Sequence, residues 1–154
     1  MTRLTEETNA RKGSLRFRRH KLFTTCHTEI YRATNGRVGH MRKGTRVLLL
    51  ETVGRKSGRK RTIPLSYLAS GEDLLLIASR AGSDFAPAWW LNLQAQPDTT
   101  VQVLSEHRKV HAREATPDER AILWPRVLAE YAIFRAYEQR TDRVIPVIIL
   151  SPAE

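Results

Sequence analysis

A run of glycine, serine and cationic residues between positions 54 and 61 is the segment of this sequence with the clearest chemistry. Residues 54–61, called the cationic turn below, read GRKSGRKR and carry five positive charges. Glycines let a backbone approach a ligand closely, and arginine and lysine donate charge-assisted hydrogen bonds to phosphate or carboxylate. The cationic turn is therefore either an anion cradle or a solvated basic hairpin tip. Its spacing does not match a P-loop, so hydrolysis of nucleoside triphosphates is not expected.

A second candidate segment ends a hydrophobic run at residues 78–82, which read ASRAG. A serine hydroxyl and backbone N–H groups in such a loop can bind the polar edge of a heterocycle. The segment PAWWLNL follows at residues 87–93, where the paired tryptophans are typical of a hydrophobic core. Asn92 can orient either a loop or a ligand, and the sequence leaves both alternatives open.

Residue patterns for catalysis without a cofactor are missing from the sequence. The five histidines lack the spacing of metal ligands, and no metal site is expected. No carboxylate pair, G-x-S-x-G elbow or cysteine-nucleophile signature occurs. Cys26, the single cysteine, excludes an internal disulfide, and we expect it to be a small buried hydrophobic residue on a helix. If the chain is an enzyme, a bound cofactor must supply the reactive group.

The charge balance indicates an anionic partner. The chain has 26 Lys and Arg against 16 Asp and Glu, a net charge of +10, and the excess lies mainly in residues 1–46 and in the cationic turn. Nucleic acid, an anionic membrane surface and a polyanionic small molecule all fit such a surface. Neither a membrane-spanning apolar run nor the apolar segment of a secretory signal occurs, so we expect a cytoplasmic protein.

The elements that must position these residues begin with a polar N-terminus. Residues 1–13 lack hydrophobic periodicity and predict a flexible tail, while residues 14–154 have the length and apolar content of one domain. Over residues 15–31, apolar side chains at helical spacing alternate with cations and predict a basic amphipathic helix. We favour packing of this helix against its own domain over contact with an anionic membrane.

Short aliphatic and β-branched runs between turn residues predict about six strands in a mainly antiparallel sheet. They are expected at residues 45–53, 61–68, 74–79, 99–104, 107–114 and 144–150. Pro64 indicates an edge position or a bulge in the second strand. Helices are expected at 87–94 and from the capping box at 116–119, with Pro125 kinking or dividing the latter. The fold class is therefore α+β with flanking helices, and a small barrel is the expected closure.

Six segments, in the same order along the chain, resemble the deazaflavin-dependent nitroreductase family. They read YRATNGRVG (31–39), LLLETVGRKSG (48–58), RTIPLSY (61–67), ASRAG (78–82), PAWWLNL (87–93) and TDRVIPV (141–147). The resemblance implies a split β-barrel like that of flavin reductases and pyridoxamine-phosphate oxidases. It also implies coenzyme F-420, an 8-hydroxy-5-deazaflavin with a phosphate and an oligoglutamate tail. The implied activity is hydride transfer from the reduced coenzyme to a small organic acceptor such as a quinone or a nitroaromatic.

The resemblance also implies roles for particular residues. The coenzyme's phosphate and carboxylates would be held by Arg55, Lys56, Ser57 and Arg61, with Pro64 shaping the adjoining strand. The deazaflavin ring and linker would lie along Ser79, Arg80, Ala81 and Gly82. Trp89 and Asn92 would build and support this pocket. The acceptor would meet Tyr131 and Tyr137 as catalytic residues, with Arg143 as a further candidate beside them.

At two places the sequence departs from the family pattern. Arg80 and Ala81 stand where Lys-Gly is frequent, and Trp90 stands where a tyrosine is usual, so the acceptor is less well defined than the coenzyme. Three other functions stay open: an FMN-binding oxidoreductase with a related barrel, which also explains a phosphate cradle; a noncatalytic deazaflavin carrier, which shares the binding residues; and a basic nucleic-acid-binding module, which explains the net charge and the basic helix. Nucleic acid is not the partner we expect. A homodimer, and peripheral contact of residues 15–31 with the inner face of the membrane, are compatible with the favoured interpretation.

Overall fold

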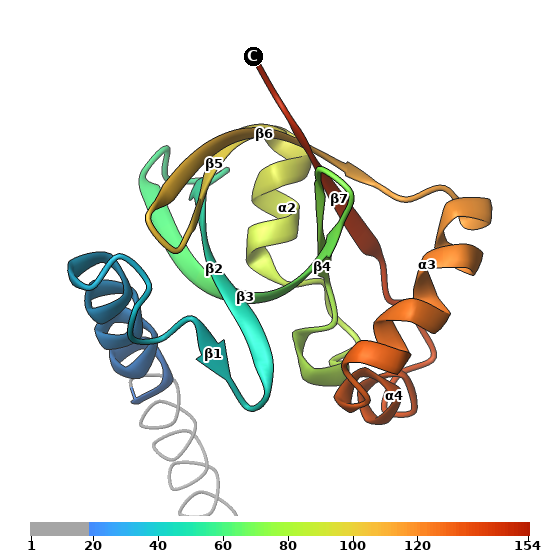
Figure 1. The fold of residues 1–154 in the computed structure, drawn as a ribbon. Helices are drawn as coiled ribbons and strands as arrows, with labels where there is room; N and C mark the ends of the chain where they lie inside the picture. Colours follow the sequence, from blue (N-terminus) through green and yellow to red (C-terminus); the bar gives the residue numbers. More distant parts are fainter. Residues whose placement is uncertain (1–18) are drawn as a thin grey trace, which may run out of the picture.

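The structure, a computed structural model, describes residues 19–154, and within this range it contains an antiparallel β-barrel. Six strands close in the order β2-β3-β4-β7-β6-β5, because β5 pairs again with β2 (Figure 1). The predicted α+β split barrel is confirmed. The strands are β1 (Met41–Arg42), β2 (Thr45–Val53), β3 (Lys60–Ser70), β4 (Asp73–Ile77), β5 (Asp98–Val103), β6 (Glu106–Glu114) and β7 (Val147–Pro152).

Most strand ends differ from the predicted bounds by one or two residues, and two differences are larger. The two-residue β1, which pairs with β2, was not expected, because two residues are too few to show an alternating pattern. The last strand begins at Val147 instead of residue 144. Pro146 has no N–H to contribute to a ladder, and its carbonyl accepts a hydrogen bond from the Ala78 N–H at 3.1 Å.

Pro64 lies where β3 has a neighbour on one side only. Residues 60–66 pair with β2 in an unbroken register, in which Pro64 faces Leu49, whereas residues 67–70 pair with β4. The missing N–H of Pro64 is therefore tolerated at a local edge of the sheet. Of the two predicted alternatives, the edge position is confirmed and the bulge is not.

One helix fills the barrel, and two others cover the outer face of two of its strands. Helix α2 (Ala88–Ala95) lies within the ring of strands in Figure 1. Its side chains Trp89, Trp90 and Leu93 pack with the inward-facing strand residues in one hydrophobic core. Helices α3 (Pro117–Glu130) and α4 (Ile133–Glu138) form a second core against the outer face of β4 and β7.

Helix α3 begins at the predicted capping box, but Pro125 does not divide it. The helix continues to Glu130, and Tyr131 forms its C-cap. Trp124 and Val127, on either side of the proline, are both buried in the outer core. Pro125 cannot donate a hydrogen bond within the helix, and the packing of its neighbours stabilises the helix at this position.

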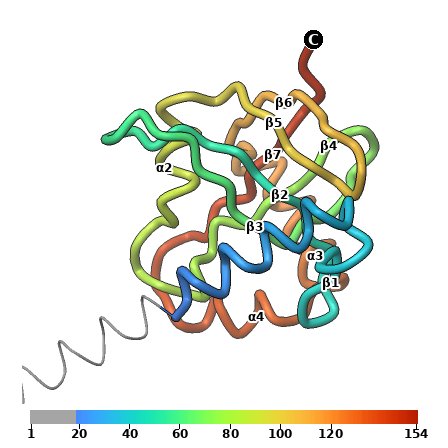
Figure 2. The backbone as a smooth tube through the Cα atoms, turned by 90° about the vertical axis from the view of Figure 1, so that its left-hand side faces the viewer, coloured from blue at the N-terminus to red at the C-terminus, as the bar shows by residue number. Residues whose placement is uncertain are grey.

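The helix of residues 19–33 lies along the outside of the barrel beside β2 and β3 (Figure 2). Only Thr28 and Tyr31 are buried within it, whereas its apolar residues Leu22, Phe23, Cys26 and Ile30 are exposed. The expectations that these apolar residues pack against the domain and that Cys26 is buried are therefore wrong. Tyr31 makes the attachment: its hydroxyl donates to the Val47 carbonyl at 3.1 Å and accepts from the Leu104 N–H at 2.8 Å.

The predicted tail at residues 1–13 and the first part of the predicted helix, up to residue 18, lie outside the described residues. Within residues 19–154, none of the helices has both the length and the apolar character needed to cross a membrane.

Candidate functional site

The cationic turn connects β2 to β3 and projects from the barrel as a hairpin tip (Figure 2). Its backbone is fixed by two hydrogen bonds of 2.8 Å, from the Gly54 N–H to the Arg59 carbonyl and from the Gly58 N–H to the Gly54 carbonyl. Gly58 has a φ of +66°, which favours glycine. A Cβ on Gly54 would lie 2.5 Å from the Ser57 hydroxyl oxygen, so a larger residue there would displace the Ser57 side chain.

The charges of the cationic turn are not neutralised by neighbouring residues. Its cations are all exposed, and none pairs with a carboxylate in the part of the chain that the structure describes; they are Arg55, Lys56, Arg59, Lys60 and Arg61. Concentrating like charges without counter-charges costs self-repulsion. A polyanionic ligand would relieve this repulsion, which favours the anion cradle over the solvated tip.

Asn92 joins the cationic turn to α2. Its side-chain oxygen accepts hydrogen bonds from the backbone N–H of Arg55 at 3.2 Å and from the Arg55 guanidinium at 3.1 Å. Its amide nitrogen donates to the Thr52 hydroxyl at 3.4 Å, and the residue is only 4% exposed. Of the two alternatives for Asn92, orienting a loop is the one that the structure shows.

The second candidate segment, Ser79 to Gly82, forms a tight loop with an unusual backbone. Ser79 has right-handed helical angles, and the next three residues, η1 (Arg80–Gly82), have φ values of +46°, +55° and +80°. Left-handed angles are costly for Arg80 and Ala81, which carry a Cβ. Such conformations persist only where the surrounding structure holds them in place, and they are frequent at functional sites.

The loop packs against α4, which brings the predicted ring contacts next to one of the predicted acceptor residues. A Cβ added to Gly82 would lie 2.6 Å from the carbonyl oxygen of Tyr137, so only glycine fits there. Arg140 donates to the Ala81 carbonyl at 3.2 Å, and its guanidinium lies 5.4 Å from the Tyr137 ring centroid. Arg140 was missed in the sequence, where nothing local distinguishes it from other surface arginines.

The two predicted catalytic tyrosines have different surroundings. Tyr137 is half-buried and packs edge-on against Phe134, with 5.8 Å between the ring centroids. Tyr131 is 5% exposed, and its hydroxyl donates to the Tyr67 carbonyl at 2.9 Å and accepts from the Arg46 N–H at 3.0 Å. Tyr131 therefore ties β2 and β3 to α3. Contact of either tyrosine with the acceptor stays a prediction.

The remaining predicted residues take three kinds of position. Trp89 and its neighbour Trp90 belong to the barrel core, as paired tryptophans usually do. Ser57 and Arg61 lie on the exposed surface of the cationic turn. Arg143 is half-buried and donates to backbone carbonyls of the loop that contains Ser79.

Both candidate segments are attached to α2. The loop of residues 79–82 leads through residues 83–87 into the first turn of this helix, and the cationic turn is bonded to Asn92 within it. One rigid element thus positions a cationic surface and a loop with left-handed backbone. An elongated molecule with a polar ring at one end and anionic groups at the other matches this pair of segments.

Comparisons with known proteins agree on one family. A family model described as F420H(2)-dependent quinone reductase matches residues 23–152. An F420H(2)-dependent quinone reductase of Mycobacterium tuberculosis is 39% identical over 129 residues, which cover 81% of this chain and 87% of that protein.

Two solved structures are similar over most of their length. One, described as an F420-H2 dependent reductase (FDR-A), has 33% sequence identity and a TM-score of 0.63 and covers 68% of this chain and 93% of its own. Another, described as a domain-swapped dimer, has 27% sequence identity and a TM-score of 0.65, and the match covers 91% of this chain and 98% of that one.

Proposed function

This chain belongs to the F420H(2)-dependent quinone reductase family, and on that premise we propose that it passes a hydride from the reduced deazaflavin coenzyme to a quinone. The observation that carries the proposal is the cationic turn, whose exposed cations have no carboxylate partner within residues 19–154 and whose first cation is bonded to α2. A phosphate with an oligoglutamate tail supplies the anionic groups that such a surface requires.

The donor set fits the two ends of the coenzyme. Arg55, Lys56, Ser57 and Arg61 would hold the phosphate and the carboxylates, because guanidinium and ammonium groups donate strong hydrogen bonds to both. Pro64 would shape the strand beside them. Ser79, Arg80, Ala81 and Gly82 would lie along the deazaflavin ring, with Trp89 and Asn92 supporting the pocket.

When bound, the reduced coenzyme supplies the hydride from C5 of its ring. The chain's own contribution is to bind and orient the coenzyme and the acceptor, because the sequence has no residue pattern typical of a catalytic acid, base or nucleophile. Tyr137 would contact the acceptor beside the loop of residues 79–82, and an aromatic ring with a hydroxyl suits a quinone. Tyr131 is proposed to contribute to the same pocket, with its hydroxyl donating a hydrogen bond to the Tyr67 carbonyl.

The test is a tryptophan-fluorescence titration of the purified protein with the deazaflavin coenzyme, run beside FMN. We expect saturable quenching by the deazaflavin only. Oxidation of the reduced coenzyme is then followed by absorbance with a water-soluble naphthoquinone or a nitroaromatic, with and without protein. Binding without turnover would indicate a noncatalytic carrier, and binding of FMN alone would indicate the related flavin enzyme.

We also propose that the protein is cytoplasmic and meets its quinone at the inner face of the membrane. The support is the exposed apolar group Leu22, Phe23 and Ile30 on the helix of residues 19–33, which also carries Arg19 and Lys21. The test is sedimentation with phosphatidylglycerol-containing vesicles at low salt.

In that experiment Leu22→Ser/Phe23→Ser should lower the bound fraction, whereas Ile122→Ser, which removes an exposed apolar residue of α3, should not. Vesicles of pure phosphatidylcholine should retain less protein than the anionic ones. Equal retention of all variants would contradict a contact through this helix.

A homodimer is a further part of the proposal. Its support is the likeness to the domain-swapped dimer. Light scattering coupled to size-exclusion chromatography measures the mass directly, and a monomeric mass at micromolar concentration would remove this part.

A further inference from the structure

One side chain, Arg143, binds three backbone carbonyls of a single loop. Its Nε donates to the Ser83 carbonyl at 2.7 Å, and its Nη2 donates to the carbonyls of Ala78 at 2.9 Å and Ser79 at 3.0 Å. Arg143 is half-buried and lies just before β7, some sixty residues along the chain from the loop. A planar guanidinium presents its donors in a fixed fork, so one arginine can hold both ends of a short loop.

The loop that Arg143 holds is the one with the left-handed backbone. Arg80 and Ala81 adopt positive φ although both carry a Cβ. The hydrogen bonds from the Gly82 N–H to the Ser79 carbonyl and from the Ser83 N–H to the Arg80 carbonyl are local, and bonds of this kind are easily exchanged for water. The long-range bonds to the loop's carbonyls come from arginines, Arg143 at residues 78, 79 and 83 and Arg140 at residue 81. One further long-range bond, from the Ala78 N–H to the Pro146 carbonyl, fixes the start of the loop. The arginines therefore hold the carbonyl side of this loop in place.

Binding the carbonyls in this way leaves backbone donors available. Within residues 19–154, the N–H groups of Ser79, Arg80 and Ala81 donate no hydrogen bond. A residue with right-handed angles followed by one with left-handed angles turns successive N–H groups toward the same side, an arrangement that binds electronegative atoms. Ser79, which begins this row, is 6% exposed.

We propose that Arg143 is a positioning residue that fixes the loop of residues 78–83 so that the N–H groups of Ser79, Arg80 and Ala81 bind the polar edge of the deazaflavin ring. The inference rests on the proposed function. Arg143 acts through the loop, and its guanidinium is occupied by the carbonyls of residues 78, 79 and 83. The loop thus selects the ring, and the cationic turn selects the anionic tail. The same N–H groups would also suit the coenzyme's phosphate, and the experiment separates these two sources of electronegative oxygen.

The experiment compares two probes by tryptophan-fluorescence titration: the whole coenzyme and 8-hydroxy-5-deazariboflavin, which has the ring but neither the phosphate nor the oligoglutamate tail. Arg143→Lys and Arg143→Ala should weaken binding of both probes by roughly tenfold or more, because an ammonium cannot bridge the three carbonyls. Arg55→Ala/Lys56→Ala should weaken binding of the whole coenzyme and leave the phosphate-free probe unchanged. Arg135→Ala, an exposed arginine of α4, is the matched control and should bind both probes like the wild type.

A rescue measurement distinguishes positioning from general stability. Methylguanidinium at millimolar concentration should restore binding of the phosphate-free probe to Arg143→Ala, because it can occupy the same carbonyls. If Arg143→Ala does not fold, Arg143→Lys, checked by thermal unfolding, carries the comparison. The absence of rescue in a folded Arg143→Ala protein would overturn the positioning role.

The other outcomes are equally decisive. Wild-type binding of the phosphate-free probe by the Arg143 variants would overturn this inference and leave the proposed function intact. A loss confined to the whole coenzyme would assign the loop to the phosphate and overturn its assignment to the ring. If the wild type binds neither probe, the proposed function fails and the inference fails with it.

Discussion

The side-chain oxygen of Asn92 accepts two hydrogen bonds from Arg55, one from the backbone N–H at 3.2 Å and one from the guanidinium at 3.1 Å. Asn92 is buried within α2, whereas Arg55 begins the exposed charges of the cationic turn. A neutral amide inside the barrel core thus determines where a surface cation stands. Coenzyme affinity should therefore depend on a residue that need not touch the coenzyme.

Asn92→Ala is expected to weaken coenzyme binding and to lower the free energy of unfolding by about 1–3 kcal/mol. The reason is that the Arg55 N–H and the buried Thr52 hydroxyl lose the hydrogen bonds that Asn92 makes with them. Urea denaturation measures the second effect, and fluorescence titration the first. Gln94→Ala, at an exposed position of the same helix, is the control and should change neither. Unchanged coenzyme affinity in Asn92→Ala would show that the orientation of Arg55 is irrelevant to binding.

The cationic turn should raise the affinity for the coenzyme because its charges lie at the binding site, and not only because they add to the net charge of the protein. Arg55→Ala/Lys56→Ala is expected to reduce coenzyme affinity by about 10- to 1000-fold, as the loss of charge-assisted hydrogen bonds implies. Arg108→Ala/Lys109→Ala removes the same two charges from β6 and serves as the control. Equal losses in the two double variants would indicate only long-range attraction, which added salt would suppress in both.

The strands and the segments of the site could be predicted because their signals are local. β2 has the predicted bounds, Thr45–Val53, and the capping box at Thr116 and Glu119 starts α3 as expected. Periodicity, however, identifies the residues that share a helix face and not whether anything covers that face. Leu22, Phe23 and Cys26 share a face that the domain leaves exposed, so their burial could not be inferred.

The contacts that shape the site could not be predicted, because they join residues far apart in the sequence. Nothing near Arg143 indicates that its guanidinium binds the carbonyls of a loop some sixty residues earlier. The partnership of Asn92 with Arg55 is equally non-local. The sequence pattern identified the segments with chemistry, and the barrel topology decides which of their side chains face a ligand and which hold the loops.

Tyr131→Phe is expected to cost about 1–3 kcal/mol of unfolding free energy, because the Tyr67 carbonyl and the Arg46 N–H lose their shared partner. Tyr137→Phe should change stability little, since the Tyr137 hydroxyl has no hydrogen bond within residues 19–154. Thermal or urea unfolding measures both. In turnover, Tyr137→Phe should raise the KM for the quinone, as expected for an acceptor contact; an unchanged KM and kcat would remove Tyr137 from the acceptor site.

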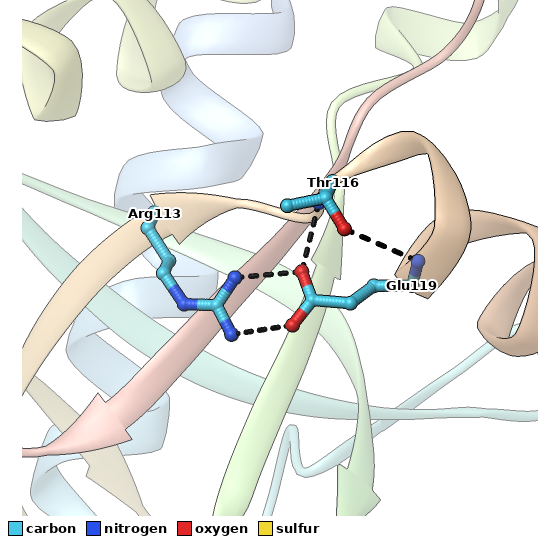
Figure 3. Close-up of polar contacts among 3 residues, drawn as sticks. All are labelled: Arg113, Thr116 and Glu119. Atoms are coloured by element: carbon cyan, nitrogen blue, oxygen red, sulfur yellow. Dashed lines mark hydrogen bonds and ion pairs between the residues drawn. The ribbon is translucent and has the colours of Figure 1, made fainter.

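Glu119 should make the stability of the fold depend on pH in the acid range. Both of its oxygens accept hydrogen bonds from Arg113, at 2.7 and 2.8 Å, and one also accepts from the Thr116 N–H at 2.8 Å (Figure 3). The pairing with Arg113, followed by the Thr116 bond, lowers the pKa of Glu119 from 4.5 to about 2. A lowered pKa means that the stabilisation is complete above pH 4.5 and is lost as the pH falls toward 2.

The comparison is between the wild type and Glu119→Gln, by urea denaturation at a series of pH values. The wild type should be the more stable at neutral pH, and the two free energies of unfolding should converge as the pH falls. Glu114→Gln, at an exposed position of β6, controls for the removal of one negative charge. A constant difference between wild type and Glu119→Gln down to pH 2 would contradict a stabilising Arg113–Glu119 pair.

Gly82→Ala and Gly71→Ala separate backbone strain from crowding in the loop against α4. Both glycines have positive φ, +80° and +61°, so each alanine should cost about 1 kcal/mol in unfolding free energy. A Cβ at Gly71 meets open space, whereas one at Gly82 would lie 2.6 Å from the Tyr137 carbonyl oxygen. Backbone cannot move as easily as a side chain, so Gly82→Ala should lose about 1–3 kcal/mol more. It should also weaken binding of the phosphate-free deazaflavin, because the loop must shift. Equal losses in the two variants would mean that α4 yields to the added methyl group and does not hold the loop in place.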